Sequence, residues 1–110
     1  MAEKFKVLIL EIVLNYILRL PENERVAIRK YIQLLRDQGY RLRMPFAKKI
    51  NARLWELRVK TSESQYRLLY FFHYKGTYFI VHAFKKKTMK IPIWEIKTGI
   101  KRMNEIVRKG

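Results

Sequence analysis

Three successive segments in the middle of the chain alternate apolar and polar residues, and this pattern constrains the fold more than any other feature. They run over residues 54–60, 65–73 and 77–84. A period of two residues is typical of β-strands that bury one face. Polar turns at Thr61–Ser64 and Lys75–Gly76 separate the segments, so the pattern predicts three consecutive strands joined as an antiparallel meander.

Apolar residues at helical spacing precede this meander. Residues 5–10 form either a short apolar strand or the start of a first helix, which continues to about Arg19. A second helix is expected between Pro21, which suits a first helical turn, and Gly39, which suits a left-handed stop. The buried stripe of this second helix is expected at Ile28, Tyr31, Ile32 and Leu35.

The remaining segments complete an α+β architecture. Residues 40–51 form a basic connector, in which Pro45 argues against a continuous helix. Pro92 opens a last helix with apolar positions at Ile93, Ile96, Ile100, Met103 and Val107. At 110 residues the chain has the size of one domain. We therefore predict a single domain over residues 1–110, with two N-terminal helices packed on a twisted antiparallel sheet of three to four strands and a C-terminal helix.

The chain is strongly basic, and this charge restricts its partners. It contains 25 Lys and Arg residues against 9 acidic ones, which gives a net charge of +16. Like charges at this density repel one another in a compact fold, so an anionic partner is expected. The cations are spread over predicted strands and loops rather than along one amphipathic helix, which favours nucleic acid over a membrane surface.

The composition disfavours several other classes of protein. The absence of cysteine excludes disulfides, cysteine-ligated metal sites and thiol catalysis, and it fits a cytoplasmic protein. His73 and His82 have no acidic cluster near them in the sequence, and no glycine-rich phosphate loop is visible. We therefore expect neither a metal nor a cofactor. Polar residues within the apolar N-terminal stretch argue against a signal peptide or a membrane span.

The expected strand register places two arginines opposite each other. If Thr61–Ser64 is a four-residue loop, Arg58 faces Arg67, and if Lys75–Gly76 is a two-residue turn, Arg67 faces Phe84. Two like charges at paired positions destabilise a sheet unless an anion lies between them. The opposite face is then almost wholly apolar and is expected to be the core side, with Leu57, Val59, Leu68, Tyr70, Phe72, Phe79, Val81 and Ala83.

Lysines after the last strand extend the positive charge on the arginine face. Continuing the strand places Lys86 on that face, and three more lysines lie close by in the exit loop. Such a group of cations can close around a phosphodiester. The sequence thus predicts a phosphate site made of Arg58, Arg67 and the exit-loop lysines Lys85, Lys86, Lys87 and Lys90.

Four short motifs, taken in order, resemble those of a known family. They are the strand Trp55–Glu56–Leu57–Arg58, the strand Tyr66–Arg67–Leu68–Leu69–Tyr70, the exit Phe84–Lys85–Lys86–Lys87–Thr88, and Pro92 ahead of an amphipathic helix. Over about residues 20 to 107 the chain is similar to the phage-derived, HigB-like branch of the RelE/HigB toxin superfamily. Each motif is weak alone, and their combination is specific.

This resemblance implies a RelE-like fold and a type II toxin, a ribosome-dependent endoribonuclease that cuts mRNA by metal-independent attack of the 2′-hydroxyl. It also implies a cognate helix-turn-helix antitoxin, HigA-like, that neutralises the toxin. Carried over to this chain, the site residues are Arg58, Arg67 and the basic exit motif. Several relatives carry a Tyr or His near the C-terminus as an acid or base, and this chain has neither there. We expect RNA contacts from Arg43, Lys48, Lys49, Lys60, Lys85, Lys87 and Lys90.

The chemistry of RNA cleavage suggests a catalytic role for each of four residues. Arg58 and Arg67 suit stabilisation of the charge on the phosphorane, because their planar forks bind phosphate oxygens and their high pKa makes them poor proton shuttles. Lys86 is the leading candidate for base or acid, since neighbouring cations lower the pKa of a lysine. His82, which the register places opposite Leu69 on the arginine face, is the alternative.

Other interpretations of the same residues stay open. A non-catalytic nucleic-acid binder, or a ParE-like relative that inhibits a topoisomerase by contact, would share the positive charge without needing the catalytic cluster. Trp55 and Tyr66 could stack on bases, whereas Tyr70 and Phe72 are expected to pack in the core. The function of Trp94 on the last helix is left open.

Overall fold

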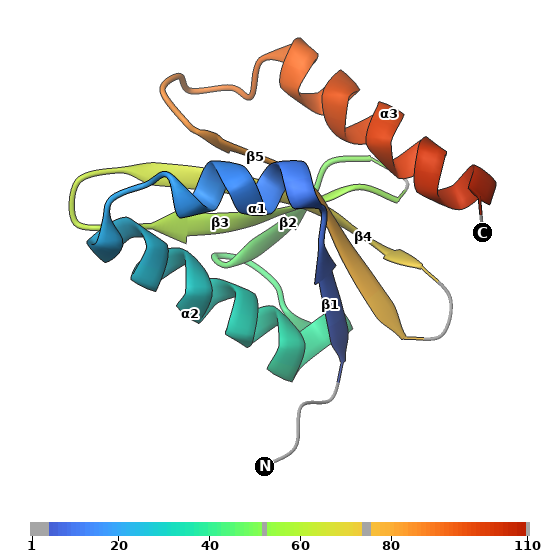
Figure 1. Ribbon diagram of the computed structural model, residues 1–110, viewed down its shortest axis with the longest axis horizontal. Helices are drawn as coiled ribbons and strands as arrows, with labels where there is room; N and C mark the ends of the chain where they lie inside the picture. Colours follow the sequence, from blue (N-terminus) through green and yellow to red (C-terminus); the bar gives the residue numbers. More distant parts are fainter. Residues whose placement is uncertain (1–4, 52, 74–75, 110) are drawn as a thin grey trace.

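The computed structural model describes residues 5–51, 53–73 and 76–109, which form an α+β fold (Figure 1). Within these residues three helices and five strands follow one another, with a short 3-10 turn at Gly39–Arg41. In chain order the elements are β1 (Lys6–Ile9), α1 (Glu11–Leu18), α2 (Glu22–Gln38), β2 (Ala47–Lys49), β3 (Trp55–Lys60), β4 (Gln65–His73), β5 (Thr77–Lys85) and α3 (Ile93–Lys109).

The sheet is larger than predicted, and it is mixed rather than antiparallel. Its strand order is β1-β5-β4-β3-β2. The predicted meander is confirmed as β3, β4 and β5, which pair antiparallel in succession. At the two edges, β1 runs parallel to β5 and β2 pairs antiparallel with β3. The described part of the chain thus forms five strands, where three to four antiparallel strands were expected.

The two edge strands, β1 and β2, form through pairing with strands of the meander. The sequence allowed either a strand or the start of a helix for residues 5–10. Lys6–Ile9 is a strand because pairing with β5 satisfies its backbone hydrogen-bonding groups and the fold buries Val7. β2 lies within the segment that was predicted as a connector. Its three residues are too few for a readable alternation, and its pairing with β3 places Ala47 opposite Leu57.

The register predicted around the arginines is confirmed. Arg58 pairs with Arg67, and Arg67 pairs with Phe84. The β3–β4 loop is closed by the amide of Thr61, which donates to the Ser64 carbonyl at 2.9 Å. A four-residue loop therefore sets this register, as the sequence predicted.

At the far end of the β4–β5 hairpin the predicted register is wrong by one residue. Lys75 of the expected turn lies outside the described residues, and beside it His73 pairs with Thr77. A register shift between Leu69 and Tyr70 then brings the strands into the expected alignment toward the arginines. The predicted alignment is therefore correct in only one half of the hairpin.

This shift changes which residues face which side of the sheet. Phe79 and Val81 were predicted on the core side beneath the N-terminal helices, but Tyr78 and Ile80 pack there instead. Phe79 and Val81 pack with α3 on the opposite face. One irregular residue in a strand is enough to reverse every side chain beyond it, because strand side chains alternate with a period of two.

Helices cover both faces of the sheet. The predicted packing of the N-terminal helices is confirmed, since Val13 of α1 and Leu35 of α2 share a core with Leu57. A second core lies on the arginine face, where Met103 of α3 packs with Leu69. The arginine face is therefore partly apolar and partly covered by α3, which the sequence analysis did not anticipate.

The ends of α2 agree with the predictions, with one difference. Pro21 directly precedes α2 instead of lying in its first turn, and Gly39 ends the helix with a φ of 53°. Ile93 was predicted on the buried stripe of the last helix but is 69% exposed, whereas Gly99 and Met103 are buried. No helix in the described ranges is long and apolar enough to cross a membrane.

Candidate functional site

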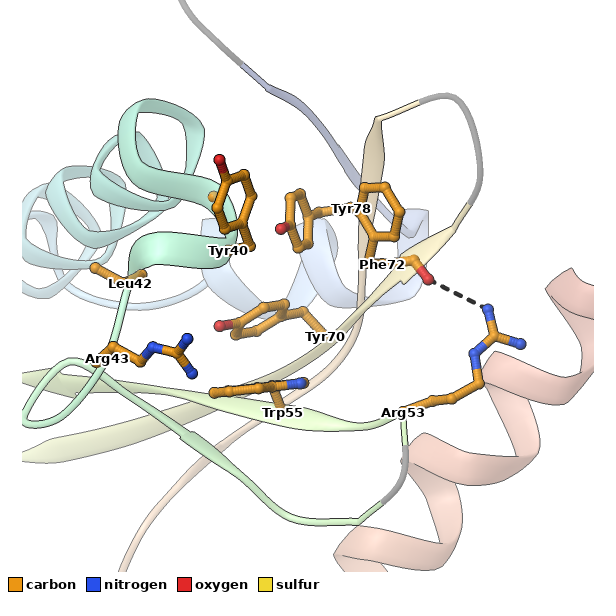
Figure 2. A pocket seen from close by; sticks show the side chains of 9 residues that line it. Tyr40, Leu42, Arg43, Arg53, Trp55, Tyr70, Phe72 and Tyr78 are labelled. Atoms are coloured by element: carbon orange, nitrogen blue, oxygen red, sulfur yellow. Dashed lines mark hydrogen bonds between the residues drawn. The ribbon is translucent and has the colours of Figure 1, made fainter.

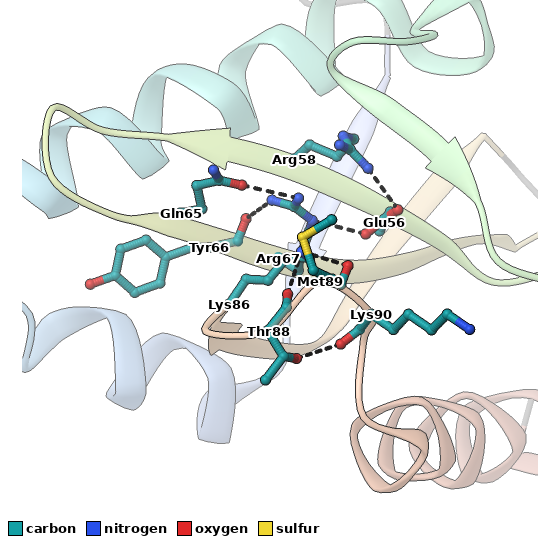
Figure 3. Close-up of polar contacts among 9 residues, drawn as sticks. All are labelled: Glu56, Arg58, Gln65, Tyr66, Arg67, Lys86, Thr88, Met89 and Lys90. Atoms are coloured by element: carbon teal, nitrogen blue, oxygen red, sulfur yellow. Dashed lines mark hydrogen bonds and ion pairs between the residues drawn. The ribbon is translucent and has the colours of Figure 1, made fainter.

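Glu56 lies between the two paired arginines of the sheet (Figure 3). Its Oε2 accepts a hydrogen bond from Nη1 of Arg58 at 3.2 Å. Its Oε1 lies 3.0 Å from Nε of Arg67, in an ion pair that lacks hydrogen-bond geometry. One carboxylate therefore offsets the repulsion between two guanidinium groups.

This carboxylate corrects the interpretation of the arginine pair. We expected an anion from outside the protein to lie between Arg58 and Arg67, and the chain supplies one itself. Glu56 lies two residues before Arg58 in β3, so the alternation of the strand places both side chains on one face. The same periodicity that revealed the arginines could have revealed Glu56.

The two arginines differ strongly in exposure. The side chain of Arg67 is 3% exposed, against 29% for Arg58. Arg67 also donates to the carbonyl of Tyr66 and to Oε1 of Gln65, each at 3.2 Å. Burial lowers the pKa of Arg67, and the nearby charge of Arg58 lowers it further while Glu56 raises it. Arg58 therefore presents the accessible guanidinium, and Arg67 lies enclosed behind it.

Lys86 brings a third cation to the site from the end of β5. Its backbone amide donates to the carbonyl of Gln65 at 2.8 Å. Its Nζ donates to the carbonyls of Thr88, at 2.6 Å, and Met89, at 3.0 Å. An ammonium group has three hydrogens, so these two bonds leave one of them for another acceptor.

The pKa of Lys86 is lowered, as the sequence predicted, although the largest cause differs. Desolvation by burial comes first, and the positive charges of Arg67 and Arg58 follow. Glu56 opposes them by raising this pKa. This lowered pKa favours the neutral amine of Lys86. We call Glu56, Arg58, Arg67 and Lys86 the cationic cluster.

A groove of about 520 Å³ adjoins the cationic cluster. It lies between the β3–β4 loop and the exit loop after β5, and its lining is rich in hydroxyl groups and cations. Four lysines line it, three of which were predicted to contact RNA and one of which belongs to the cluster: Lys60, Lys85, Lys87 and Lys86.

The other predicted RNA contacts divide between the two faces of the sheet. Lys48 pairs with Glu56 and so lies on the arginine face. Lys90 is exposed at the end of the exit loop, where its carbonyl accepts a hydrogen bond from Oγ1 of Thr88 at 2.5 Å. Arg43 and Lys49 are not brought to the cluster, because both lie at the opposite face, beside Trp55.

Figure 2 shows the pocket in which Arg43 lies. The pocket has a volume of about 390 Å³ and an aromatic lining that includes Trp55 and Tyr70. Arg43 lies over the ring of Trp55, 6.0 Å from its centre. Tyr70 is buried, as predicted, whereas Phe72 is 47% exposed and not a core residue. The pocket lies at the far end of β4 from Arg67 and is separate from the cationic cluster.

His82 lies on the arginine face but is engaged elsewhere. It pairs with Leu69 as predicted. Its Nε2 lies 2.5 Å from Oε1 of Glu95, and Nη1 of Arg102 donates to its Nδ1 at 3.2 Å. Since an accepting Nδ1 carries no hydrogen, the ring is neutral and Nε2 donates to the carboxylate. Burial lowers the pKa of His82, which agrees with a neutral ring.

The structure separates His82 from Lys86. Phe84 lies between them along β5, and its ring centre is 5.5 Å from that of His82. Both nitrogens of His82 hold residues of α3 to the sheet. The four residues predicted to be catalytic therefore divide into a cluster of three and one partly buried histidine.

The aromatic residues near the cluster differ in accessibility. Tyr66 is 1% exposed and its hydroxyl donates to Glu24, so its ring is enclosed in the first core. Burial and Glu24 raise the pKa of this tyrosine. Trp94 is 63% exposed in the first turn of α3. Of these two rings, only that of Trp94 is open to a ligand.

No group of three or more His, Cys, Asp or Glu side chains suited to a metal ion occurs among the described residues. No curated protein matches the sequence. The model of the family described as phage-derived protein Gp49-like (DUF891) matches residues 15–104. This match covers most of the chain and includes β2 to β5, the exit loop and most of α3. The chain therefore belongs to the Gp49-like phage-derived protein family, a RelE-like family associated with toxin–antitoxin systems.

Proposed function

We propose that this protein is the toxin of a type II toxin–antitoxin pair, of the HigB-like branch, and that it cuts mRNA on the ribosome. The observation that carries the proposal is the cationic cluster, in which Arg58 and Arg67 share Glu56 while Lys86 approaches from β5. Family membership supports the association with toxins. The net charge of +16 supports a polyanionic substrate.

In this proposal Arg58 contacts the scissile phosphate, and Lys86 contacts the adjoining 2′-hydroxyl. Arg58 has one Nη atom bound to Glu56, and none of the described residues occupies its other donors. A guanidinium held in this way can donate to a nonbridging oxygen without reorganising when charge builds up on the phosphorane. The adjoining groove then receives the RNA backbone, whose phosphates meet Lys60, Lys85 and Lys87.

Arg67 acts as a positioning residue rather than as a direct ligand. Its burial keeps it from the RNA, yet it orients Glu56, which in turn holds Arg58. Its charge also lowers the pKa of Lys86. Electrostatic effects of this kind act through a low-dielectric interior and do not need contact with the substrate.

Lys86 is the proton-transfer group of the proposed reaction. In its neutral form it can donate two hydrogens to Thr88 and Met89 and still direct a lone pair at the RNA 2′-hydroxyl. Lys86 takes the proton of the 2′-hydroxyl as the 2′-oxygen attacks phosphorus. The bond from phosphorus to the 5′-oxygen then breaks, and a water molecule donates a proton to the leaving oxygen. The cluster contains one such group, so we propose that the ribosome orients the mRNA and supplies the remaining alignment.

Primer extension on mRNA translated in vitro tests this function. Wild-type protein is expected to produce new 3′ ends, and Lys86→Met is expected to remove them while circular dichroism and thermal unfolding stay unchanged. Lys109→Met, at the exposed end of α3, is the matched control and is expected to cut like the wild type. Intact mRNA with the wild type, or normal cutting by Lys86→Met, would contradict the proposed mechanism.

A non-catalytic binder is the second candidate. It is favoured by the burial of Arg67 and by Glu56, whose single carboxylate is shared by both arginines. Such a protein, including a ParE-like inhibitor of a topoisomerase, would leave mRNA intact at every concentration. Inhibition of translation without new mRNA ends, or of a topoisomerase with translation unaffected, would favour this candidate.

We also propose a helix-turn-helix antitoxin, HigA-like, as the protein partner. A partner that neutralises the toxin must cover the cationic cluster or its groove, and acidic side chains are the complement of these lysines. Co-expression with the product of an adjacent helix-turn-helix gene is the direct test. The expected result is a stable complex that no longer cuts mRNA.

A further inference from the structure

A pocket of about 400 Å³ lies on the other side of the exit loop from the RNA groove. The two share Lys85, Lys87 and Thr88, so the exit loop forms a wall of both. The exposed ring of Trp94 lines the pocket, and Phe84 and the buried carboxylate Glu95 also belong to its lining. An RNA strand that binds in the groove and passes over the exit loop therefore reaches this pocket.

We propose that this pocket holds one base of the RNA next to the cut, stacked on Trp94, and that it selects adenine or cytosine over uracil. The inference rests on the proposed function for the identity of the strand, and it adds a base-selecting site to the cationic cluster. We call this pocket the base pocket.

The aromatic lining favours a base as the occupant. Trp94 is 63% exposed, although a large apolar ring gains from being covered. It stands beside two lysines, Lys85 and Lys87, which can hold the phosphates on either side of a stacked base. In proteins that bind single-stranded RNA, a base commonly stacks on an aromatic ring of this kind while cations hold the backbone.

The charge of Glu95 excludes a phosphate from the same position. Its side chain is 8% exposed, and Oε1 is taken by Nε2 of His82. No hydrogen bond from the described residues reaches Oε2. A carboxylate only accepts hydrogen bonds, so it repels a phosphate and attracts a donor such as an exocyclic amino group.

Tyr16 supplies the complementary donor. Burial raises the pKa of its hydroxyl, and the negative charges of Glu24 and Glu95 raise it further, so the hydroxyl keeps its hydrogen. Tyr16 lines the pocket together with Trp94 and Glu95. The base pocket is thus lined by an acceptor, Glu95, and a donor, Tyr16.

This pair of groups matches the Watson–Crick edges of two of the RNA bases. Adenine presents an amino group next to the acceptor N1, and cytosine presents one next to the acceptor N3. Uracil presents carbonyl oxygens where the amino group would be, and a carboxylate repels them. A site that leaves a buried polar group unpaired discriminates strongly, so the preference against uracil is expected to be about tenfold or more.

The experiment measures binding and does not depend on cleavage. Trinucleotides with 2′-O-methyl groups have no free 2′-hydroxyl for attack, and fluorescein-labelled A-A-A, C-C-C and U-U-U report affinity by anisotropy at low salt. The wild type is expected to bind A-A-A and C-C-C about tenfold more tightly than U-U-U. Trp94→Ala is expected to weaken A-A-A binding about tenfold through lost stacking, while Ile93→Ala, an exposed neighbour, leaves it unchanged.

A second variant tests the selection itself. Glu95→Gln keeps a carbonyl oxygen for His82 and replaces the other oxygen with an amide N–H group, which can donate to uracil. This variant is expected to shift the preference toward U-U-U, whereas loss of stacking alone would weaken all three trinucleotides equally. Fluorescence gives an independent readout, because Trp55→Phe leaves Trp94 as the one tryptophan. Binding of A-A-A is expected to quench the fluorescence of Trp94.

The outcomes separate this inference from the proposed function. Binding without base preference, or without any effect of Trp94→Ala, overturns the base pocket even if mRNA is cut. Base-selective binding by a protein that leaves mRNA intact supports the base pocket and overturns the ribonuclease. Equal affinity of Glu95→Gln and wild type for U-U-U overturns the assignment of Glu95.

Discussion

Oε1 of Glu56 lies 3.0 Å from Nε of Arg67, and both side chains are more than nine-tenths buried. Such a pair is expensive to desolvate and stabilises the fold only while both partners are present. It joins β3 to β4 at the centre of the site and holds Arg58 through the second oxygen of Glu56. Folding and the proposed chemistry therefore depend on the same carboxylate.

Glu56→Gln is expected to destabilise the protein by about 3 kcal/mol, because it leaves the buried charge of Arg67 without its counter-ion. The measurement is urea unfolding followed by circular dichroism. Glu63→Gln is the matched control in the exposed β3–β4 loop and is expected to change the free energy of unfolding by less than about 0.5 kcal/mol. Equal effects of the two substitutions would show that the ion pair does not stabilise the fold.

The pH dependence of cleavage reports on Lys86. If its neutral amine is the base, the rate rises with pH and is half-maximal at the lowered pKa of Lys86, below the ordinary lysine value of 10.5. Arg58→Gln removes one of the charges that lower this pKa, so the profile is expected to move to higher pH in addition to the loss of rate. A profile that keeps its midpoint in Arg58→Gln would contradict the assignment of the base.

The lowered pKa of His82 predicts that the stability of the protein depends on pH. Burial is the chief cause that lowers the pKa of His82 in the folded protein from 6.5. At a pH between the folded pKa and 6.5, the unfolded chain therefore binds a proton that the folded chain does not. The stability is therefore fully present above pH 6.5 and falls as the pH drops toward the folded pKa. Thermal unfolding between pH 7.5 and 5.5 is expected to show this loss, and His82→Gln to reduce it.

Gly39 and Gly76 form a matched pair, because both have positive φ, 53° and 70°, but different surroundings. A Cβ at Gly39 would lie 2.3 Å from the ring of Phe5, whereas a Cβ at Gly76 meets no atom within 4 Å. Gly76→Ala is expected to cost about 1 kcal/mol from backbone strain alone. Gly39→Ala adds a steric clash and is expected to cost clearly more by the same unfolding measurement. Similar costs would contradict the close packing of Phe5.

Local features of the sequence predicted much of the fold. Alternation identified β3, β4 and β5, and a four-residue loop placed Arg58 opposite Arg67. These features depend on residues close together in the chain, so they can be recognised without tertiary structure. β1 and β2 could not be predicted in the same way, since each is short, and β1 forms through pairing with a strand that is distant in sequence.

The candidate site was predicted only in part. Arg58, Arg67 and Lys86 come together as expected, because register alone determines their neighbourhood. Glu56 was missed although its position in β3 contained the signal. His82 was expected to face the same cluster, but α3 brings Glu95 and Arg102 to its two nitrogens. No local pattern shows which residues a later helix will place against a strand.

The sequence by itself determined that the protein is basic, that it contains a three-stranded meander, and that two arginines oppose each other on it. Only the tertiary structure decided that Arg67 is buried while Arg58 is accessible, that Glu56 lies between them, and that Trp94 stands exposed beside the exit loop. The physical reason is that periodicity and charge are properties of the chain. Burial and the partners of a buried charge depend on segments that meet only when the chain folds.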